Sequence, residues 1–309
     1  MKHFLHTFFL FIPLFSLGQI DTSGLAILGK ETVLSEVVIR SDLKLSQFLM
    51  RVKNDTSFYK AFRNLRILGF TSLNDIKILD KSGAVHASLY SKTKQTINAG
   101  CRTMQILEEK STGDIYNGQE LNYYTAGLYA GLFFTKGKVC GETNIVKNME
   151  WDVNNKSGIE KHKEQLKMLF FNPGKKIPGI PFIGDKIDVF DPEIAKYYQF
   201  SIDMEDIKEQ SCYIFKILPL PNLSESERKH LVFDNITTWF NAKTMEIVGR
   251  KYDLSYNTPV YDFDVHMEVW MTHFKGLLVP ELLRYKGNWK VVFKKRERAV
   301  FTATLFDFD

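Results

Sequence analysis

The stretch VYDFDVHMEVWMTHF at residues 260–274 alternates between apolar and polar side chains for longer than an ordinary strand does. Its apolar phase consists of Tyr261, Phe263, Val265, Met267, Val269 and Met271. Its polar phase consists of Asp262, Asp264, His266, Glu268, Trp270 and Thr272. Successive side chains of a strand point to opposite faces, so the pattern predicts one long strand with a single buried face. Long strands of this kind are typical of curved antiparallel sheets and of barrels.

Two interpretations fit the polar phase of this strand. Two aspartates, a histidine and a glutamate are suitable ligands for a metal ion or suitable groups for acid–base chemistry. Neighbours on one face of a strand lie about 6.5–7 Å apart, however, so an ion would need further ligands from an adjacent strand. His273 and Glu281 are candidates, but no pattern brings them there. We therefore favour a solvated or cross-strand-paired face, and we predict no catalytic residue, no metal and no cofactor.

Helical spacing occurs near the beginning of the chain. Apolar residues recur at i, i+3, i+4 and i+7 within residues 42–65, first from Leu45 to Val52 and again from Phe58 to Leu65. This spacing predicts two short amphipathic helices or one bent helix. A capping box at Ser157–Glu160 predicts a further helix over residues 157–171.

Most of the remaining chain shows strand signals. From Leu73 to Phe134 the period is two, with turn residues at Asp80–Gly83 and at two later positions, and from Val232 onwards strand patterns are almost continuous. The run at residues 121–134 fits a strand or a helix. Pro280 places its strand at a sheet edge or at a bulge. We predict a mainly β fold: a long, curved antiparallel sheet or incomplete barrel with a few helices on its concave side.

The first 18 residues match a signal peptide. Lys2 precedes an apolar run that is too short to span a bilayer, and Ser16 and Gly18 are the small residues of a cleavage site. We expect cleavage after Gly18, an exported protein in the periplasm or outside the cell, and one β-rich domain over residues 19–309. No later segment has the composition of a transmembrane helix, and nucleic acid is an unsuitable partner for an exported chain.

The chain has three cysteines, Cys101, Cys140 and Cys212. An oxidising compartment favours one disulfide, and the glycine-flanked Cys101 and Cys140 are the candidates, although spacing alone leaves the pairing open. Cys212 has the surroundings of a buried strand residue. The spacings match no zinc motif, and the common hydrolase, metalloprotease and nucleotide-binding motifs are absent, which favours a non-enzymatic role.

Basic residues gather near the end of the chain. On a strand, one face would carry Lys290, Lys294, Arg296 and Arg298. One interpretation is contact with an anionic partner, such as lipid head groups or an acidic protein. The other is a charged face that protects a sheet edge.

The loop at residues 172–186 is rich in glycine and proline and yet carries Ile177, Ile180, Phe182 and Ile183. Loops normally run over the surface, so these apolar side chains pack back onto the core, cover an apolar pocket or meet a membrane.

The hairpin pattern TTWFNAKTMEIVGRKYDLSY (237–256), together with the order of the elements, resembles the periplasmic outer-membrane lipoprotein-sorting family. In that family a tryptophan precedes the turn, as Trp239 precedes the Asn241–Thr244 turn here. The resemblance implies an incomplete barrel whose concave apolar face receives acyl chains. The chain departs from the family in the 140–190 insertion and in having no assignable match to the arginine that holds the family's helices closed.

Three hypotheses follow. The first is a carrier that binds a lipid or lipoprotein, with the helices and the 172–186 loop as covers. Its candidate ligand-binding residues are Phe48, Phe58, Phe62, Ile180, Phe182, Phe263 and Met267. The second is a non-enzymatic envelope protein that binds a partner through the basic face. The third is a metal-dependent hydrolase that uses the polar face of the long strand.

Overall fold

The computed structural model describes residues 32–34, 43–146, 169, 171–176, 183–207, 209–258, 261–291 and 295–309. One sheet dominates, in the order β1-β8-β9-β10-β11-β12-β13-β14-β2-β3-β4-β7, and β5 pairs with β6 separately. The strands are β1 (Thr32–Leu34), β2 (Phe70–Leu79), β3 (Val85–Asn98), β4 (Cys101–Thr112), β5 (Tyr116–Asn117), β6 (Glu120–Leu121), β7 (Val139–Cys140), β8 (Tyr198–Ile207), β9 (Gln210–Pro219), β10 (Phe233–Asn241), β11 (Ile247–Asn257), β12 (Tyr261–Phe274), β13 (Leu277–Val291) and β14 (Glu297–Phe306). The helices are α3 (Leu45–Asn54), α4 (Ser57–Asn64), α5 (Tyr124–Phe133), α7 (Pro192–Ala195) and α8 (Glu225–Arg228).

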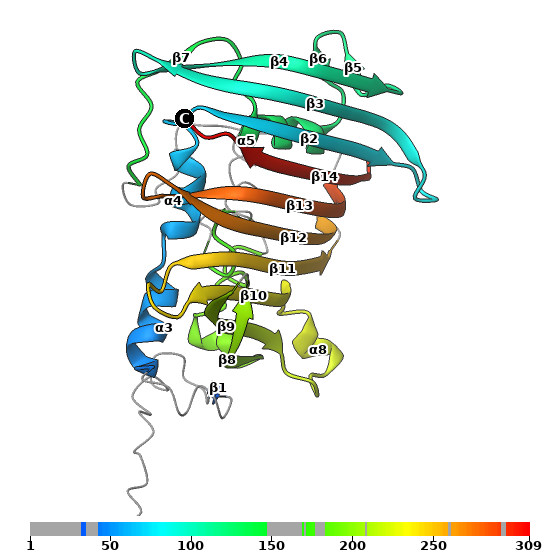
Figure 1. The fold of residues 1–309 in the computed structure, drawn as a ribbon. Coiled ribbons are helices and arrows are strands. Elements are labelled where there is room, and N and C mark those ends of the chain that lie inside the picture. Colours follow the sequence, from blue (N-terminus) through cyan, green and yellow to red (C-terminus); the bar gives the residue numbers. More distant parts are fainter. Residues whose placement is uncertain are drawn as a thin grey trace, which may run out of the picture.

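The sheet is curved, and its two ends do not meet (Figure 1). Every pairing within it is antiparallel except that of β1 with β8. The last strand, β14, pairs with β2. This one pairing joins the strands from the C-terminal half of the chain to those from the N-terminal half. The predicted mainly β architecture, an incomplete barrel, is confirmed.

Local sequence explains the tight connections. The β12–β13 turn has Lys275 and Gly276 at positive φ, the geometry that a two-residue hairpin requires. Asp80 accepts hydrogen bonds from the backbone of Ser82 and Ala84 in the predicted β2–β3 turn. Pro280 lies beside an irregularity in the β12–β13 register, so its strand carries the predicted bulge rather than forming a sheet edge.

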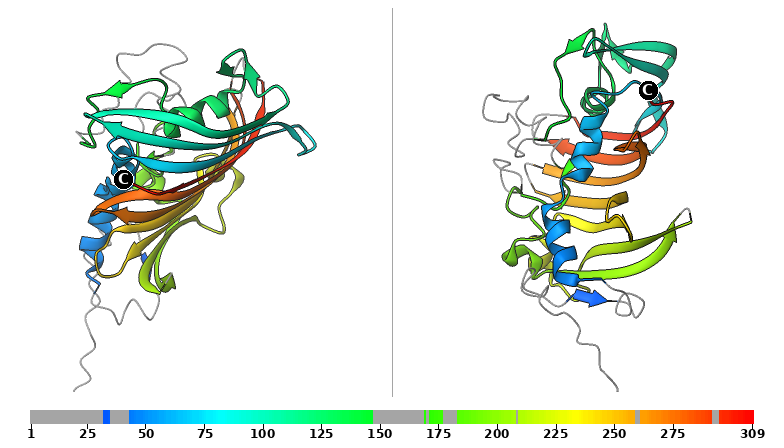
Figure 2. Two further views of the ribbon diagram at one scale, coloured as in Figure 1. Left: turned by 45° about the horizontal axis from the view of Figure 1, so that its top comes forward. Right: turned by 60° about the vertical axis from the view of Figure 1, so that its left-hand side comes forward.

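Helices α3, α4 and α5 lie on the concave side of the sheet (Figure 2). The apolar stripes predicted for the first two are buried, including Phe48, Leu49 and Phe58. The ambiguous run at residues 121–134 contains a helix, α5. In the part of the chain that is described, no helix is long and apolar enough to cross a membrane. The predicted signal peptide lies outside the described residues, and so does the 157–171 helix apart from Leu169 and Phe171.

Candidate functional site

The two faces of β12 separate as the alternation predicts. Phe263, Val265, Met267, Val269 and Met271 are all buried on the concave side. Across the strands, Met267 lies opposite Tyr252 of β11 and Tyr285 of β13, which are also buried. The concave face around Met267 is therefore an apolar and aromatic surface.

The polar face of β12 is paired with neighbouring side chains. His266 Nδ1 contacts the Asp253 carboxylate. Glu268 accepts a hydrogen bond from Trp270 Nε1 at 2.5 Å and lies 3.3 Å from Arg284. Burial opposes ionisation of Glu268, but these two donors outweigh it and lower the pKa. This is the cross-strand pairing that the sequence favours.

His273 and Glu281, the residues considered as further ligands, give no metal site with this face. Over the described residues no group of three His, Cys, Asp or Glu side chains is placed to hold a metal ion. His273 lies 3.4 Å from Glu246 instead.

Three of the four predicted partner-binding residues lie near one end of the β13–β14 pair. Lys290 is opposite Asp262 in the register, and Arg298 is opposite Asn288. Arg296 binds the Asp262 carboxylate and donates to Asn288 Oδ1 at 3.0 Å. Lys294 lies outside the described residues. The basic face is thus assembled, but part of its charge is neutralised by β12.

An apolar cavity lies between α5 and the central strands. Its lining consists of Leu128, Leu169, Leu254, Phe263, Val265, Tyr285 and Trp289. Its volume is about 40 Å³, which is room for roughly three water molecules. Ligand pockets are usually several hundred Å³, so the cavity admits a bulky apolar molecule only if α5 moves outward.

Among the predicted ligand-binding residues that the structure describes, only Phe263 lines this cavity. Phe48 packs against three aromatic rings of β9 and β10, and Phe58 packs edge-on against Phe62. Met267 is buried in the same core. Ile180 and Phe182 lie outside the described residues, whereas their neighbour Ile183 is buried.

Helix α5 is fixed over the cavity at its N-terminus. The Glu297 carboxylate of β14 accepts hydrogen bonds from the backbone N–H of Tyr124 at 2.9 Å and of Thr125 at 2.8 Å. Thr125 Oγ1 also donates to Glu297 and accepts from Trp289 Nε1. A carboxylate at this position satisfies N–H groups that have no partner within the helix and complements the helix dipole.

The concave face becomes polar toward β2 and β3. Its buried polar residues there are Ser72, Asn74, Ser91, Thr93 and Gln95. Tyr129 of α5 donates to Asn74 Oδ1 at 2.9 Å, and Gln95 Nε2 donates to the carbonyls of Leu65 and Leu68 at 2.7 Å each. The sequence analysis missed this cluster. Its signal was one phase of β3, where uncharged polar residues alternate with lysines.

A buried charged cluster was also missed. Arg250 of β11 points to the concave side, donates to Thr238 Oγ1 at 3.0 Å and lies 4.6 Å from the Phe58 ring centroid. Its guanidinium is 3.9 Å from the carboxylate of Asp55, in the α3–α4 joint. Lys175 donates to the Asp55 carbonyl, and burial lowers the pKa of Lys175 to about 8. In the sequence, Arg250 beside Lys251 resembled an ordinary exposed basic pair.

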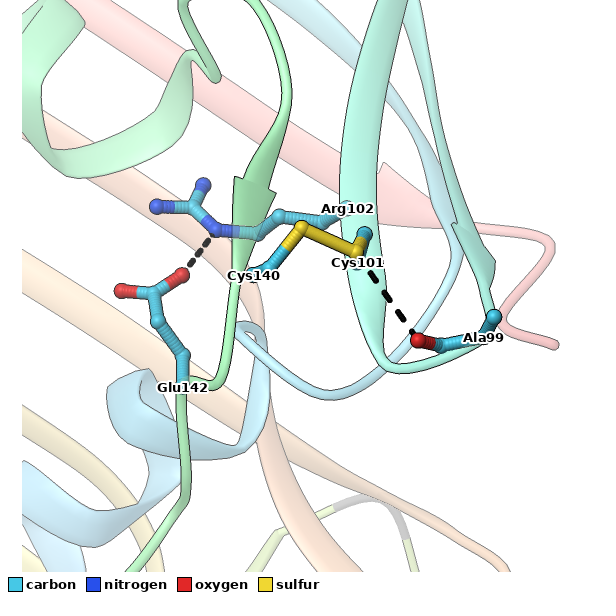
Figure 3. Close-up of a disulfide and its surroundings, with 5 residues drawn as sticks. All are labelled: Ala99, Cys101, Arg102, Cys140 and Glu142. Carbon is cyan, nitrogen blue, oxygen red and sulfur yellow. Dashed lines mark hydrogen bonds and ion pairs between the residues drawn. A yellow bond between two sulfur atoms is a disulfide. The ribbon is translucent and has the colours of Figure 1, made fainter.

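The structure joins Cys101 to Cys140 in a disulfide, the pairing that the sequence left open (Figure 3). The bond links β7, the last strand of the sheet, to its neighbour β4, and the two cysteines lie opposite each other in the register. Cys212 is free and buried, as predicted.

No protein-family model and no curated protein sequence matches the chain. Among solved structures, it is similar to a DUF1329 family protein from Desulfovibrio piger (10% identity, TM-score 0.24, covering 82% of this chain and 93% of that one). It is also similar to a putative outer membrane lipoprotein-sorting protein domain from Vibrio parahaemolyticus (8%, 0.25, 82% and 91%) and to a LolA superfamily protein from Nitrosomonas europaea (7%, 0.21, 82% and 93%). Neighbours of this kind are those that the sequence resemblance predicted. At these identities and TM-scores, no residue role is transferred to this chain.

Proposed function

We propose that this chain is an exported, periplasmic protein that binds a hydrophobic ligand on the concave face of its open sheet. The observation that carries the proposal is the cavity between α5 and strands β11–β13, which has only apolar and aromatic side chains in its lining. Such a lining favours hydrocarbon and offers a charged group no ion-pair partner. The ligand class is therefore a lipid, or the acyl chains of a lipoprotein.

Ligand entry requires α5 to act as a cover. The helix meets the sheet through Leu128 at the cavity and through hydrogen bonds of Thr125 near its N-terminus and of Tyr129 in its middle, so outward movement of α5 would join the cavity to the apolar surface around it. The Cys101–Cys140 disulfide supports export, because such bonds persist in oxidising compartments. With the signal peptide expected at residues 1–18, it favours a periplasmic carrier.

The test is native mass spectrometry of the protein exported to its own compartment, followed by denaturing extraction. We expect a mass excess that extracts as acyl lipid. Val265→Phe fills the cavity and should abolish the excess, whereas Val300→Phe makes the same change on the opposite face of the sheet and should retain it. A protein without excess mass, or equal lipid in the two variants, would refute the proposal.

A second candidate is attachment to an anionic envelope surface, which the grouping of Lys290, Arg296 and Arg298 supports. Sedimentation with vesicles that contain anionic phospholipid tests it. We expect binding that weakens with salt and weakens further in Lys290→Glu/Arg298→Glu. Salt-independent binding, or none, would exclude this surface.

A further inference from the structure

The disulfide joins β7, the last strand of the sheet, to its neighbour β4, and the two strands share few backbone contacts. Strand β7 contributes only two residue pairs to β4, Cys101 with Cys140 and Arg102 with Val139. Cys140 is exposed and Cys101 is half-buried, so the bond can be reached from solvent. Figure 3 shows the bond at the edge of the sheet, with the chain continuing from Cys140 toward Glu142.

The chain from Val139 to Ile145, which we name the strap, connects this edge to α4. Glu142 accepts from Arg66 Nη1 at 2.5 Å and from Arg102. The Thr143 carbonyl accepts from Arg63 Nη2 at 2.6 Å. Asn144 donates to Asn64 Oδ1 at 2.9 Å, and Asn64 in turn donates to the Leu278 carbonyl of β13. Three consecutive strap residues therefore hold the C-terminal end of α4.

The chain that leads from α5 into the strap is bound to β3 and β4. Thr135, two residues after the helix, donates to Gln95 and accepts from Arg102. Phe133, the last residue of α5, packs against Phe62 of α4. Helix α4 is thus bound to the strap directly, whereas α5 is linked to it through the chain after Phe133 and through Arg102, which binds both Thr135 and the strap residue Glu142.

We propose that the Cys101–Cys140 disulfide is a reversible clasp on α4 and α5, and that it is opened by thiol–disulfide exchange with a dithiol reductant. A thiolate of the dithiol attacks the Cys140 sulfur, the S–S bond breaks, and Cys101 leaves as a thiolate that takes up a proton. The second thiol of the dithiol then displaces Cys140 and closes its own disulfide. The protein gains two electrons and two protons, and the reductant loses them.

The remaining contacts of the strap are noncovalent. The Arg66 side chain is 41% exposed in its ion pair with Glu142, and ion pairs of exposed groups contribute little stability. The Arg102 side chain, which also binds Glu142, is 17% exposed and is the stronger of the two contacts. Without the disulfide, two residue pairs between β4 and β7 and a few polar contacts must keep together two positions that are 39 residues apart in the sequence. We therefore expect the strap, α4 and α5 to open together more often, while β11–β13 stay folded.

The first experiment measures access to the bond. The folded protein is treated with graded dithiothreitol, labelled with N-ethylmaleimide and analysed by peptide mass spectrometry. We expect Cys101 and Cys140 to be labelled at concentrations that leave the buried Cys212 unlabelled, so that Cys212 reports retention of the fold. Labelling of all three cysteines together would show that the bond is reduced only on unfolding, and would overturn the proposal.

The second experiment measures hydrogen exchange in peptides that cover α4, α5 and the strap. Reduced protein and Cys101→Ser/Cys140→Ser should exchange at least tenfold faster in all three segments, with β11–β13 unchanged; Cys212→Ser is the control for cysteine loss. If the double variant does not fold, the reduced wild-type protein gives the same comparison. Faster exchange confined to the strap would overturn the coupling to α4 and α5. Exchange does not depend on a ligand, so this test is independent of the proposed function.

Discussion

The concave face has different inward side chains over β11–β13 than over β2 and β3. Over β11–β13 most inward side chains are apolar, such as Leu254, Val265 and Met267, and the packing around them leaves a cavity; the buried Arg250 is an exception. Over β2 and β3, apolar inward residues such as Ile76 and Leu89 are accompanied by buried polar residues that bond to one another: Ser72 lies 2.7 Å from Thr93, and Asn74 donates to Ser72 at 3.0 Å. Helix α5 covers both halves, with Leu128 over the apolar half and Tyr129 over the polar one.

The two halves therefore differ in role: one can fix the position of α5, and the other offers an apolar surface to a ligand of the proposed kind. Hydrogen bonds are directional, so the Tyr129–Asn74 bond fixes where α5 lies. Apolar contact is not directional, so the other half does not fix the position of α5 in this way. A carrier of the proposed kind needs both a positioned cover helix and an apolar surface, and substitutions can change one half at a time.

The largest effect is expected for Met267→Asp. The side chain is 1% exposed in the apolar half, so the substitution buries a carboxylate without a partner. We expect a loss of about 4 kcal/mol or more in the free energy of unfolding, or no folded protein. Chemical denaturation measures it. Thr272→Asp, on the opposite face of the same strand, should stay within about 0.5 kcal/mol of wild type; equal losses would mean that the two faces are not distinct.

In the polar half, Asn74→Leu should cost about 2 to 3 kcal/mol, because it removes the partner of buried hydroxyl groups. The Tyr129 hydroxyl keeps only the Thr302 carbonyl at 3.2 Å. A double-mutant cycle with Tyr129→Phe tests the network by denaturation. The double variant should lose less stability than the sum of the single variants, since it leaves no unpaired phenol. Simple additivity would show that the bond does not position α5.

The third prediction concerns the charged cluster at the α3–α4 joint. The pKa of Lys175 is lowered by burial to about 8 in the folded protein, against about 10.4 in an unfolded chain. Between these values the unfolded chain binds more protons, so the free energy of unfolding rises with pH. Above pH 10 the buried tyrosines, whose pKa values are raised, oppose the rise.

From pH 8 to pH 10 we expect Lys175 to add about 2 kcal/mol to the free energy of unfolding, as measured by urea denaturation at several pH values. Lys175→Met should remove this rise. Lys176→Met, which changes the exposed neighbour, should keep it. The same pH dependence in Lys175→Met and in wild type would contradict the burial of the charge.

Much of this architecture is encoded locally. Alternation along β12, the stripes of α3 and α4 and the Asp80 turn depend on neighbours within a few residues, and the sequence analysis recovered them. Contacts between distant residues were not recoverable in this way. Glu297 caps α5 from 172 positions away in the chain, and Arg250 is buried only because α3 and α4 fold across it. Phe48, Phe58 and Phe62 had the composition of a ligand surface, but their packing against other rings places them in the core.

The smallest effect is expected for His266→Ala, on the polar face of β12. Its contact with Asp253 is between side chains that are about one-third exposed, and Asp253 keeps a second donor in Asn235 at 3.1 Å. Pairs of this kind contribute less than about 1 kcal/mol, so the variant should unfold within about 0.5 kcal/mol of wild type. Zinc titration by calorimetry gives the second readout, because a metal site would lose a ligand while a paired face would lose nothing. Met267 is the next residue along the strand. The contrast between a near-silent change at 266 and a disruptive one at 267 would show that the polar side of β12 is assembled from replaceable pairs, while its apolar side belongs to the core.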